Sequence, residues 1–127
     1  MKRFTLVMLA LLLCASTVFA QIQIDWWHSM TGKNALALEE LAKRFNDSQT
    51  AYKVVPAFKG SYSDSMNAGI AAFRAKQPPH IIQVYEVGTA TMMNAGGAIY
   101  PVYKLMKDAG EKFDPKVYIP TITGYYS

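Results

Sequence analysis

The chain has 127 residues, of which 51% are hydrophobic, and a formal net charge of +4. This length is enough for one domain of modest size. The basic residues form no patch, so the small positive charge does not favour a nucleic-acid partner. The single cysteine, Cys14, excludes a disulfide within the chain.

Residues 1–20 (MKRFTLVMLALLLCASTVFA) have the pattern of a secretory signal peptide. Basic residues at Lys2–Arg3 precede the apolar run Phe4–Cys14, and small residues at Val18 and Ala20 precede a cleavage point. The apolar run is too short to cross a hydrocarbon core of about 30 Å. We therefore predict cleavage after Ala20 and export from the cytoplasm. The remaining 107 residues lose two basic residues with the signal, and keep a charge of +2 and no cysteine.

The first half of the exported part is predicted to be strand, helix and strand. Residues 21–27 (QIQIDWW) alternate between apolar and polar side chains, which favours a strand. Residues 34–48 have a helical period and residues 52–58 (YKVVPAF) form a second strand, in which Pro56 indicates an edge or a strand end. The apolar face of this helix is expected to consist of Leu38, Leu41, Ala42 and Phe45.

The second half begins with a helix marked by Met66, Ile70 and Phe73 and ended by the prolines at 78–79. Residues 80–85 (HIIQVY) form a continuous apolar run, typical of a strand buried in a parallel sheet. Further expected elements are a short helical stretch over 86–94 and a helix over 100–109 with Gly110 as its cap. Residues 111–127 have no clear period.

The order β-α-β-α-β-α predicts an α/β fold with a mostly parallel β-α-β-α-β core. In open sheets of this class, ligands bind beyond the carboxyl ends of the strands. Three segments follow predicted strands, namely 28–31, 59–63 and 85–89, and we expect them to share one edge of the sheet. Their hydroxyls, imidazole, ammonium and carboxylate groups suit a small polyhydroxylated or anionic ligand.

Simpler roles exist for most of these residues. The hydroxyl residues are equally suitable as helix caps, and His28 is equally suitable as a structural histidine. With only two histidines and no cysteine after residue 20, we expect no metal site. Glu86 is the strongest candidate for ligand contact, because a carboxylate directly after a buried strand is costly unless it has partners. The adjacent residues Trp26 and Trp27 face opposite sides of their strand, so one of them can wall a pocket. The possible caps are Ser29, Thr31, Ser61, Ser63 and Thr89.

No catalytic signature is present in the sequence. It has no glycine-rich dinucleotide fingerprint, phosphate-binding loop, nucleophile elbow or metal-ligand spacing. We therefore expect neither an enzyme nor a cofactor.

Four stretches of the chain carry a resemblance, namely WHSM at 27–30, KGSY at 59–62, AGIAAFR at 68–74 and QVYEVGTATMM at 83–93, with further similarity at 101–103 and 124–127. Together they resemble the periplasmic glycerol-3-phosphate-binding proteins of ABC importers. This group is part of the extracellular solute-binding protein family, which includes the maltose-binding protein. QVYEVGTATMM is long and unusual enough to be specific, whereas WHSM also resembles sugar-binding relatives.

The resemblance implies a function in transport. It implies capture of sn-glycerol-3-phosphate or a glycerophosphodiester in the periplasm, delivery to a membrane permease, and a monomeric protein that makes or breaks no bond. Tyr62 and Glu86 match the family's ligand-binding tyrosine and glutamate, and Glu86 is expected to accept hydrogen bonds from the glycerol hydroxyls. The alternatives are a maltodextrin-type sugar as ligand, a truncated product that binds nothing, and an exported α/β enzyme.

The family's proteins have two lobes that close on the ligand. The resemblance implies that residues 21–127 are the N-terminal part of the first lobe and that the second lobe is absent. The arginine that would pair with the phosphate is then expected beyond Ser127. We also expect an exposed apolar surface where the remaining segments would pack.

Overall fold

The computed structural model describes residues 20–123. The predicted signal peptide lies outside the described residues, apart from Ala20. The chain divides into two compact units, which meet between Gln83 and Val84 and are described separately. The fold is α/β, as predicted.

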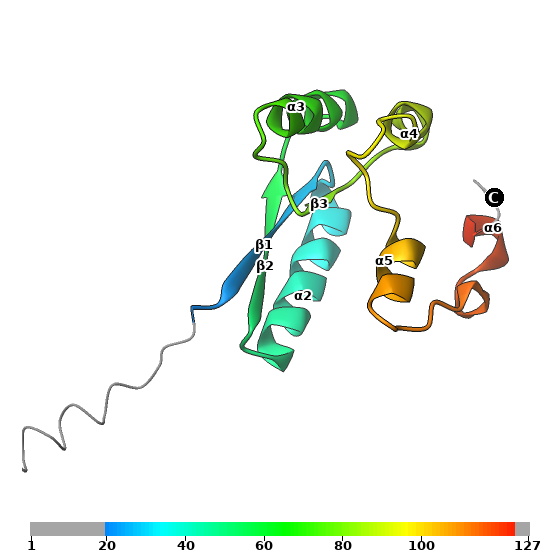
Figure 1. Ribbon diagram of the computed structural model, residues 1–127. Coiled ribbons are helices and arrows are strands. Elements are labelled where there is room, and N and C mark those ends of the chain that lie inside the picture. Colours follow the sequence, from blue (N-terminus) through cyan, green and yellow to red (C-terminus); the bar gives the residue numbers. More distant parts are fainter. Residues whose placement is uncertain (1–19, 124–127) are drawn as a thin grey trace, which may run out of the picture. The chain divides into compact units, whose positions relative to one another are not determined.

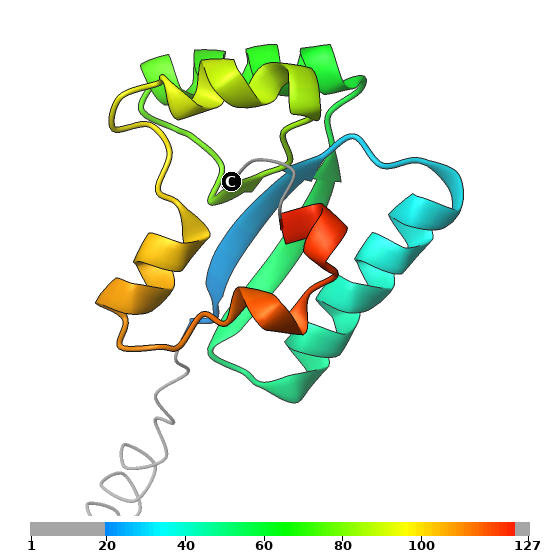
Figure 2. The same cartoon turned by 90° about the vertical axis from the view of Figure 1, so that its right-hand side faces the viewer.

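The first unit is a three-stranded parallel sheet with two helices (Figures 1 and 2). The strands lie in the order β2-β1-β3, and both pairings are parallel. The elements in chain order are β1 (Ile22–His28), α2 (Gly32–Ser48), β2 (Tyr52–Phe58), α3 (Tyr62–Arg74) and β3 (Ile81–Ile82).

The strand β2 is an edge strand, as Pro56 indicated. A proline removes one backbone donor, which an edge strand tolerates on its unpaired side. The amide of Asn46, in the last turn of α2, covers part of that side: its Nδ2 donates to the Val54 carbonyl at 2.8 Å, and its Oδ1 accepts from the Val54 N–H at 2.7 Å. The helix therefore satisfies backbone groups that the sheet leaves open.

One face of the sheet packs against α2. In the register of the strands, Trp26 lies opposite Pro56 and Ile81, so these residues share a face. Leu38 and Ala42 of α2 are buried, as predicted. Leu41 and Phe45 lie on the same apolar side of α2 as Ala42, as predicted, but remain 56% and 44% exposed. They line an apolar groove beside the sheet.

The other face of the sheet packs against α3. Its buried positions are the small residues Ser65 and Gly69, one residue before the predicted Met66 and Ile70. Phe73 is 45% exposed. The helix lies so close to the sheet that a Cβ on Gly69 would collide with Cδ1 of Ile82. Small residues therefore take the contact positions, and the larger ones lie to the side.

The third strand is shorter than predicted. Residues 80–85 were expected to be one strand, but only Ile81 and Ile82 pair with β1. On one side, Nδ1 of His80 accepts from the Asp25 N–H at 3.1 Å in place of a backbone acceptor. On the other, the Gln83 N–H donates to the Trp27 carbonyl at 2.9 Å, directly before β1 ends at His28. The partner strand sets the length of β3.

The regular elements of the second unit, from Val84 onward, are helices joined by turns and loops. The predicted helix at 100–109 is confirmed as α5, and the Gly110 cap has φ +75° with its N–H bonded to the Lys107 carbonyl at 3.1 Å. The segment without a clear period contains two short helical turns. The elements are α4 (Glu86–Met93), α5 (Val102–Asp108), the 3₁₀ helix η1 (Pro115–Val117) and α6 (Pro120–Thr123).

Candidate ligand-binding site

Two of the three predicted loops begin at the same edge of the sheet. The Lys59 N–H, one residue beyond the end of β2, donates to the carbonyl of His28, the last residue of β1, at 2.9 Å. This bond confirms that the segments 28–31 and 59–63 leave the sheet side by side at the carboxyl ends of their strands.

The strand order makes this edge a suitable place for a ligand. The chain leaves β1 through α2 toward β2, whereas β3 lies on the other side of β1. Connections that leave neighbouring strands toward opposite faces open a crevice between them, and α/β proteins bind ligands there. The crevice is expected between the ends of β1 and β3.

Gln83 connects the ends of these two strands. Its N–H donates to the Trp27 carbonyl at 2.9 Å, and its Oε1 accepts from the Ser29 N–H at 3.0 Å. Sequence reasoning did not identify this residue. The only signal was a polar side chain inside the apolar run HIIQVY, and its partner depends on strand pairing that the sequence does not show.

His28 has a structural role. Its side chain is buried, with 3% of the residue exposed, and its Nδ1 accepts from the Met30 N–H at 3.3 Å. Its ring lies 6.1 Å from the ring of Phe58 on the neighbouring strand. These contacts fold the turn after β1 and support the structural alternative for this histidine.

The hydroxyl residues behave differently from one another. Ser61, one of the possible caps named from the sequence, does cap α3: its Oγ accepts from the Asp64 N–H at 3.2 Å. Thr31 occupies the N-cap position of α2 without a side-chain bond, and the Thr89 hydroxyl donates to the Tyr85 carbonyl at 3.1 Å inside α4. The Ser29 Oγ is buried and has no hydrogen-bond partner among residues 20–123. Its expected capping role was wrong.

Tyr62 is the first residue of α3, and the turn before it determines its place. Gly60 has φ +82°, a conformation that favours glycine, and a Cβ there would approach Oδ2 of Asp64 to 2.9 Å. Ser61 and Asp64 form a capping box. Hydrogen bonds from the Ser61 side chain and backbone lower the pKa of the Asp64 carboxyl. This loop presents Tyr62 with 40% of its surface exposed.

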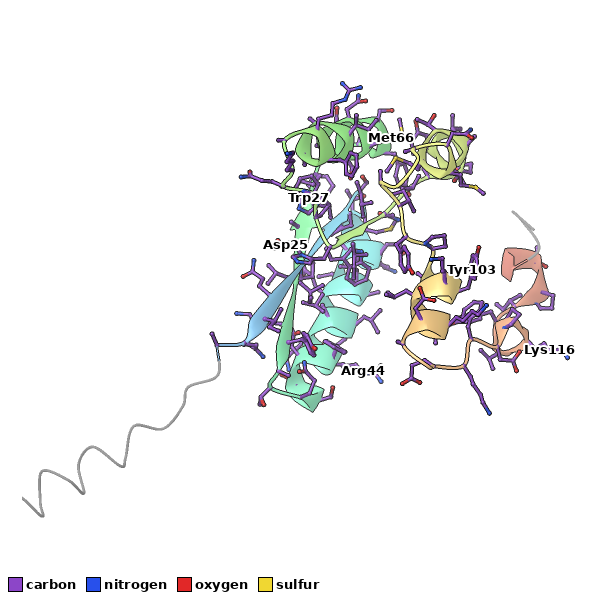
Figure 3. The ribbon with its side chains drawn as sticks, viewed as in Figure 1. Asp25, Trp27, Arg44, Met66, Tyr103 and Lys116 are labelled. Carbon is purple, nitrogen blue, oxygen red and sulfur yellow. The ribbon has the colours of Figure 1, made fainter. Side chains whose placement is uncertain are left out.

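A cation lies against an aromatic ring at the same edge. The Nζ of Lys59 lies 4.2 Å from the ring centroid of Trp27, a geometry typical of a cation–π contact. Figure 3 shows Trp27 near the carboxyl end of β1, close to α3. Sequence analysis placed Lys59 in the loop but did not predict this contact, because it depends on the pairing of β1 with β2.

Glu86 begins α4 in the second unit and is exposed. A negative charge in the first turn of a helix is favourable, because free N–H groups point toward it. The argument that Glu86 is a costly buried carboxylate was therefore wrong, since the strand ends at Ile82 and the residue lies outside the sheet. Its contact with a ligand remains a prediction.

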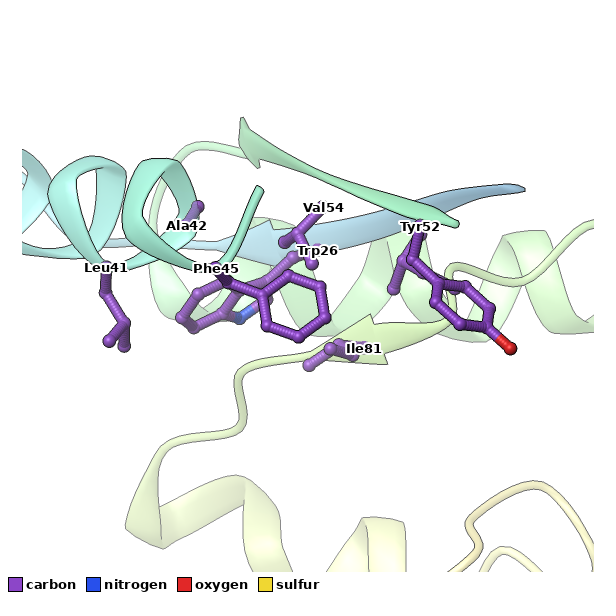
Figure 4. Close-up of a pocket in the computed structure, with 8 residues that line it drawn as sticks. Trp26, Leu41, Ala42, Phe45, Tyr52, Val54 and Ile81 are labelled. Atoms are coloured by element: carbon purple, nitrogen blue, oxygen red, sulfur yellow. The ribbon is translucent and has the colours of Figure 1, made fainter. Parts of the chain in front are cut away.

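An apolar hollow of the first unit is unsuited to a polar ligand. It has a volume of about 460 Å³ and an almost entirely apolar lining, in which Trp26 contributes one wall, as expected for one of the two tryptophans (Figure 4). We call it the apolar groove; it is lined by Ile24, Trp26, Leu41, Ala42, Phe45, Tyr52, Val54 and Ile81.

Two further features were sought in the described residues. No three metal-ligating side chains from residues 20–123 lie close enough together to hold a metal ion. Within the same range, no helix combines the length and the apolar character needed to cross a membrane.

Comparison with known proteins confirms the resemblance noted in the sequence. The chain is 52% identical over 112 residues to the sn-glycerol-3-phosphate-binding periplasmic protein UgpB of Brucella abortus, which corresponds to 88% of this chain and 26% of the relative. Relatives of the same name from Rhizobium meliloti and Yersinia pestis are 55% identical over 108 residues and 51% over 113. No family model matches the chain. The chain spans about a quarter of the length of these relatives, and over that span it is similar to periplasmic sn-glycerol-3-phosphate-binding proteins.

Proposed function

We propose that the chain belongs to the substrate-binding component of an ABC importer. It captures sn-glycerol-3-phosphate, or a glycerophosphodiester, in the periplasm and delivers it to a membrane permease without chemical change. The identity of 52% to 55% with relatives of that name carries this proposal. The parallel sheet supports it, because the polar loops after β1 and β2 leave from one edge.

The proposal includes the organisation of the chain. Residues 1–20 are a cleaved signal peptide, and residues 21–127 are the N-terminal part of the first solute-binding lobe. The protein acts as a monomer and needs no nucleic acid or cofactor.

Tyr62 and Glu86 are the proposed ligand-binding residues. Tyr62 contacts the ligand through its hydroxyl, and the exposed Glu86 carboxylate accepts hydrogen bonds from the glycerol hydroxyls. Hydrogen bonds to a charged group are strong and directional, which favours a polyol over an apolar solute. A carboxylate repels phosphate, so Glu86 belongs at the glycerol end.

The test supplies the rest of the binding protein from a relative. Residues 21–123 replace the matching segment of the Rhizobium meliloti relative, to which the chain is 55% identical over 108 residues. Calorimetry then measures binding of sn-glycerol-3-phosphate and of maltose to this hybrid. We expect it to bind glycerol phosphate and not maltose; tight binding of maltose alone would overturn the proposal in favour of a maltodextrin-type ligand.

Variants of the hybrid test the two residues. Glu86→Gln removes a charged acceptor and is expected to weaken glycerol phosphate binding roughly 10- to 100-fold. Tyr62→Phe removes one hydroxyl and is expected to weaken it less. The matched controls are Glu111→Gln and Tyr52→Phe, which alter an exposed carboxylate after α5 and an exposed phenol at the amino end of β2. Equal effects of variant and control would show that neither proposed residue contacts the ligand.

A further inference from the structure

The loop after β2 carries a cation, Lys59, that has no anionic partner among residues 20–123. Lys59 is half-buried, and its Nζ lies 4.2 Å from the centroid of the Trp27 ring. The ion pairs among residues 20–123 are Lys43–Asp47, His80–Asp25 and Lys104–Asp108, so Lys59 takes part in none of them. A positive charge near the ligand edge of the sheet is therefore not neutralised by this part of the chain.

The nearest carboxylate along the sequence is already engaged. Oδ2 of Asp64 accepts from the Ser61 N–H at 3.0 Å and from the Ser61 hydroxyl at 2.7 Å. These bonds turn the carboxylate back onto the start of α3, where it closes the capping box. The Lys59 ammonium therefore contacts the Trp27 ring and not the Asp64 carboxylate.

The position of Lys59 is fixed at two points. Its backbone N–H is bonded to the His28 carbonyl at 2.9 Å, and its ammonium lies over Trp27 on the same neighbouring strand. An aromatic face attracts a cation without removing its charge. A side chain held in this way loses less conformational freedom when it meets an anion, which increases affinity.

A second unsatisfied group lies at the same edge. The Ser29 Oγ is buried without a hydrogen-bond partner in the described part of the chain, and Ser29 follows the residue to which Lys59 is bonded. A hydroxyl and an ammonium are both donors to phosphate oxygens. Among the described residues, the Ser29 hydroxyl has no hydrogen-bond partner and the Lys59 ammonium has no anionic partner, whereas the Ser29 N–H is bonded to Oε1 of Gln83.

We propose that Lys59, held over Trp27, is the group that receives the phosphate end of the ligand on this part of the protein. The inference rests on the proposed function, which supplies the ligand, and deepens it by assigning its charged end. It differs from the expectation that the phosphate-binding residues lie beyond Ser127, because it adds one such residue on this part of the chain.

The test observes the lysine directly in the chain itself. Reductive methylation with ¹³C-formaldehyde gives each lysine its own NMR signal and keeps its charge, and Lys59→Arg identifies the signal of Lys59. Millimolar sn-glycerol-3-phosphate, inorganic phosphate and uncharged glycerol are added at constant ionic strength. We expect the Lys59 signal to move saturably with the two phosphates and not with glycerol. The signal of Lys53, at the other end of β2, serves as the internal control.

A variant separates ligand contact from simple packing. Lys59→Met keeps an unbranched side chain over Trp27 and removes the charge, and Lys53→Met is its matched control. In the hybrid protein we expect Lys59→Met to weaken glycerol phosphate binding at least tenfold and to reduce its dependence on salt. A purely structural lysine would change thermal stability and leave both of these readouts unaltered.

The outcomes are distinguishable. If the hybrid binds glycerol phosphate but the Lys59 signal stays still and Lys59→Met binds normally, the inference is overturned and the proposed function stands. If the unaltered hybrid does not bind glycerol phosphate, both are overturned.

Discussion

Ser29 has a buried hydroxyl with no partner among the described residues. At the scale of single residues, such a group is a net cost, because it has lost its hydrogen bonds to water without replacement. Ser61 lies in the loop after β2, and its hydroxyl accepts from the Asp64 N–H and donates to the Asp64 carboxylate within the capping box. The same residue type therefore has opposite energetic roles at the two loops.

We predict that Ser29→Ala leaves the free energy of unfolding unchanged or raises it by about 1 kcal/mol, since it removes an unsatisfied group. Ser61→Ala is the control and should lower it by about 1 kcal/mol, because it removes the cap of α3. Urea denaturation measures both. A clear loss of stability in Ser29→Ala would mean that its hydroxyl has a partner.

Asp64 gives a prediction about pH. Hydrogen bonds from Ser61 hold its pKa below the ordinary value, so its carboxylate form is favoured in the folded chain. The stabilisation is present above the unfolded pKa and is lost as the pH falls through the lowered folded pKa, that is, below about pH 4. Asp64→Asn should therefore be less stable than the unaltered chain at pH 7, with a smaller difference near pH 3. Thermal melts at the two pH values test this; an equal difference at both would contradict it.

Some residue roles could be predicted from the sequence and others could not. Ser61 followed by Asp64 is a local pattern, and it formed the expected cap. The bonds of Gln83 and the position of Lys59 over Trp27 depend on which strands are neighbours. Glu86 was misjudged for a related reason, because β3 ends four residues before it.

At the scale of elements, periodicity located the helices and strands of the first unit and the contact face of α2, but not the contact face of α3. The residues that touch the sheet from α3 are Ser65 and Gly69, whereas the apolar pattern favoured Met66 and Ile70. Hydrophobic periodicity favours large side chains, and a close helix–sheet approach favours small ones. The sequence pattern also did not predict the length of β3, because only Ile81 and Ile82 pair with β1, next to the end of that strand.

Gly69→Ala tests the close approach of α3 to the sheet. The added Cβ would collide with Cδ1 of Ile82, so we expect a loss of about 1 to 3 kcal/mol in the free energy of unfolding. Ile82→Val removes that methyl group, and the double variant should therefore lose less than the sum of the two single changes. Denaturant titration of the three variants gives this coupling.

Gly96→Ala is the matched control for this experiment. A Cβ on Gly96 meets no atom within 4 Å, so the substitution should be nearly neutral. Additive losses in the double variant would show that the contact between Gly69 and Ile82 does not limit the packing of α3.

At the scale of the whole molecule, the first unit covers its sheet unevenly. On the face that carries Trp26, α2 covers part of the sheet and the apolar groove leaves another part open. Leu41, Phe45 and Tyr52, which line the groove, remain 44% to 56% exposed. The described residues thus leave an apolar surface exposed, and the packing of further segments on it stays a prediction. Buried parallel sheets are normally covered on both faces, so this surface is a liability for solubility in isolation.

This groove should bind a hydrophobic dye. We expect the chain to enhance the fluorescence of anilinonaphthalene sulfonate, a probe of exposed apolar surface, although its sheet is folded. Phe45→Gln and Leu41→Gln shorten the apolar wall at exposed positions, so each should reduce the dye signal without changing the circular dichroism of the backbone. Leu36→Gln is the control, because Leu36 is 66% exposed on α2 but does not line the groove. If all three variants lower the signal equally, the dye reports general looseness of the fold; a loss confined to the Phe45 and Leu41 variants shows that the dye binds in the groove.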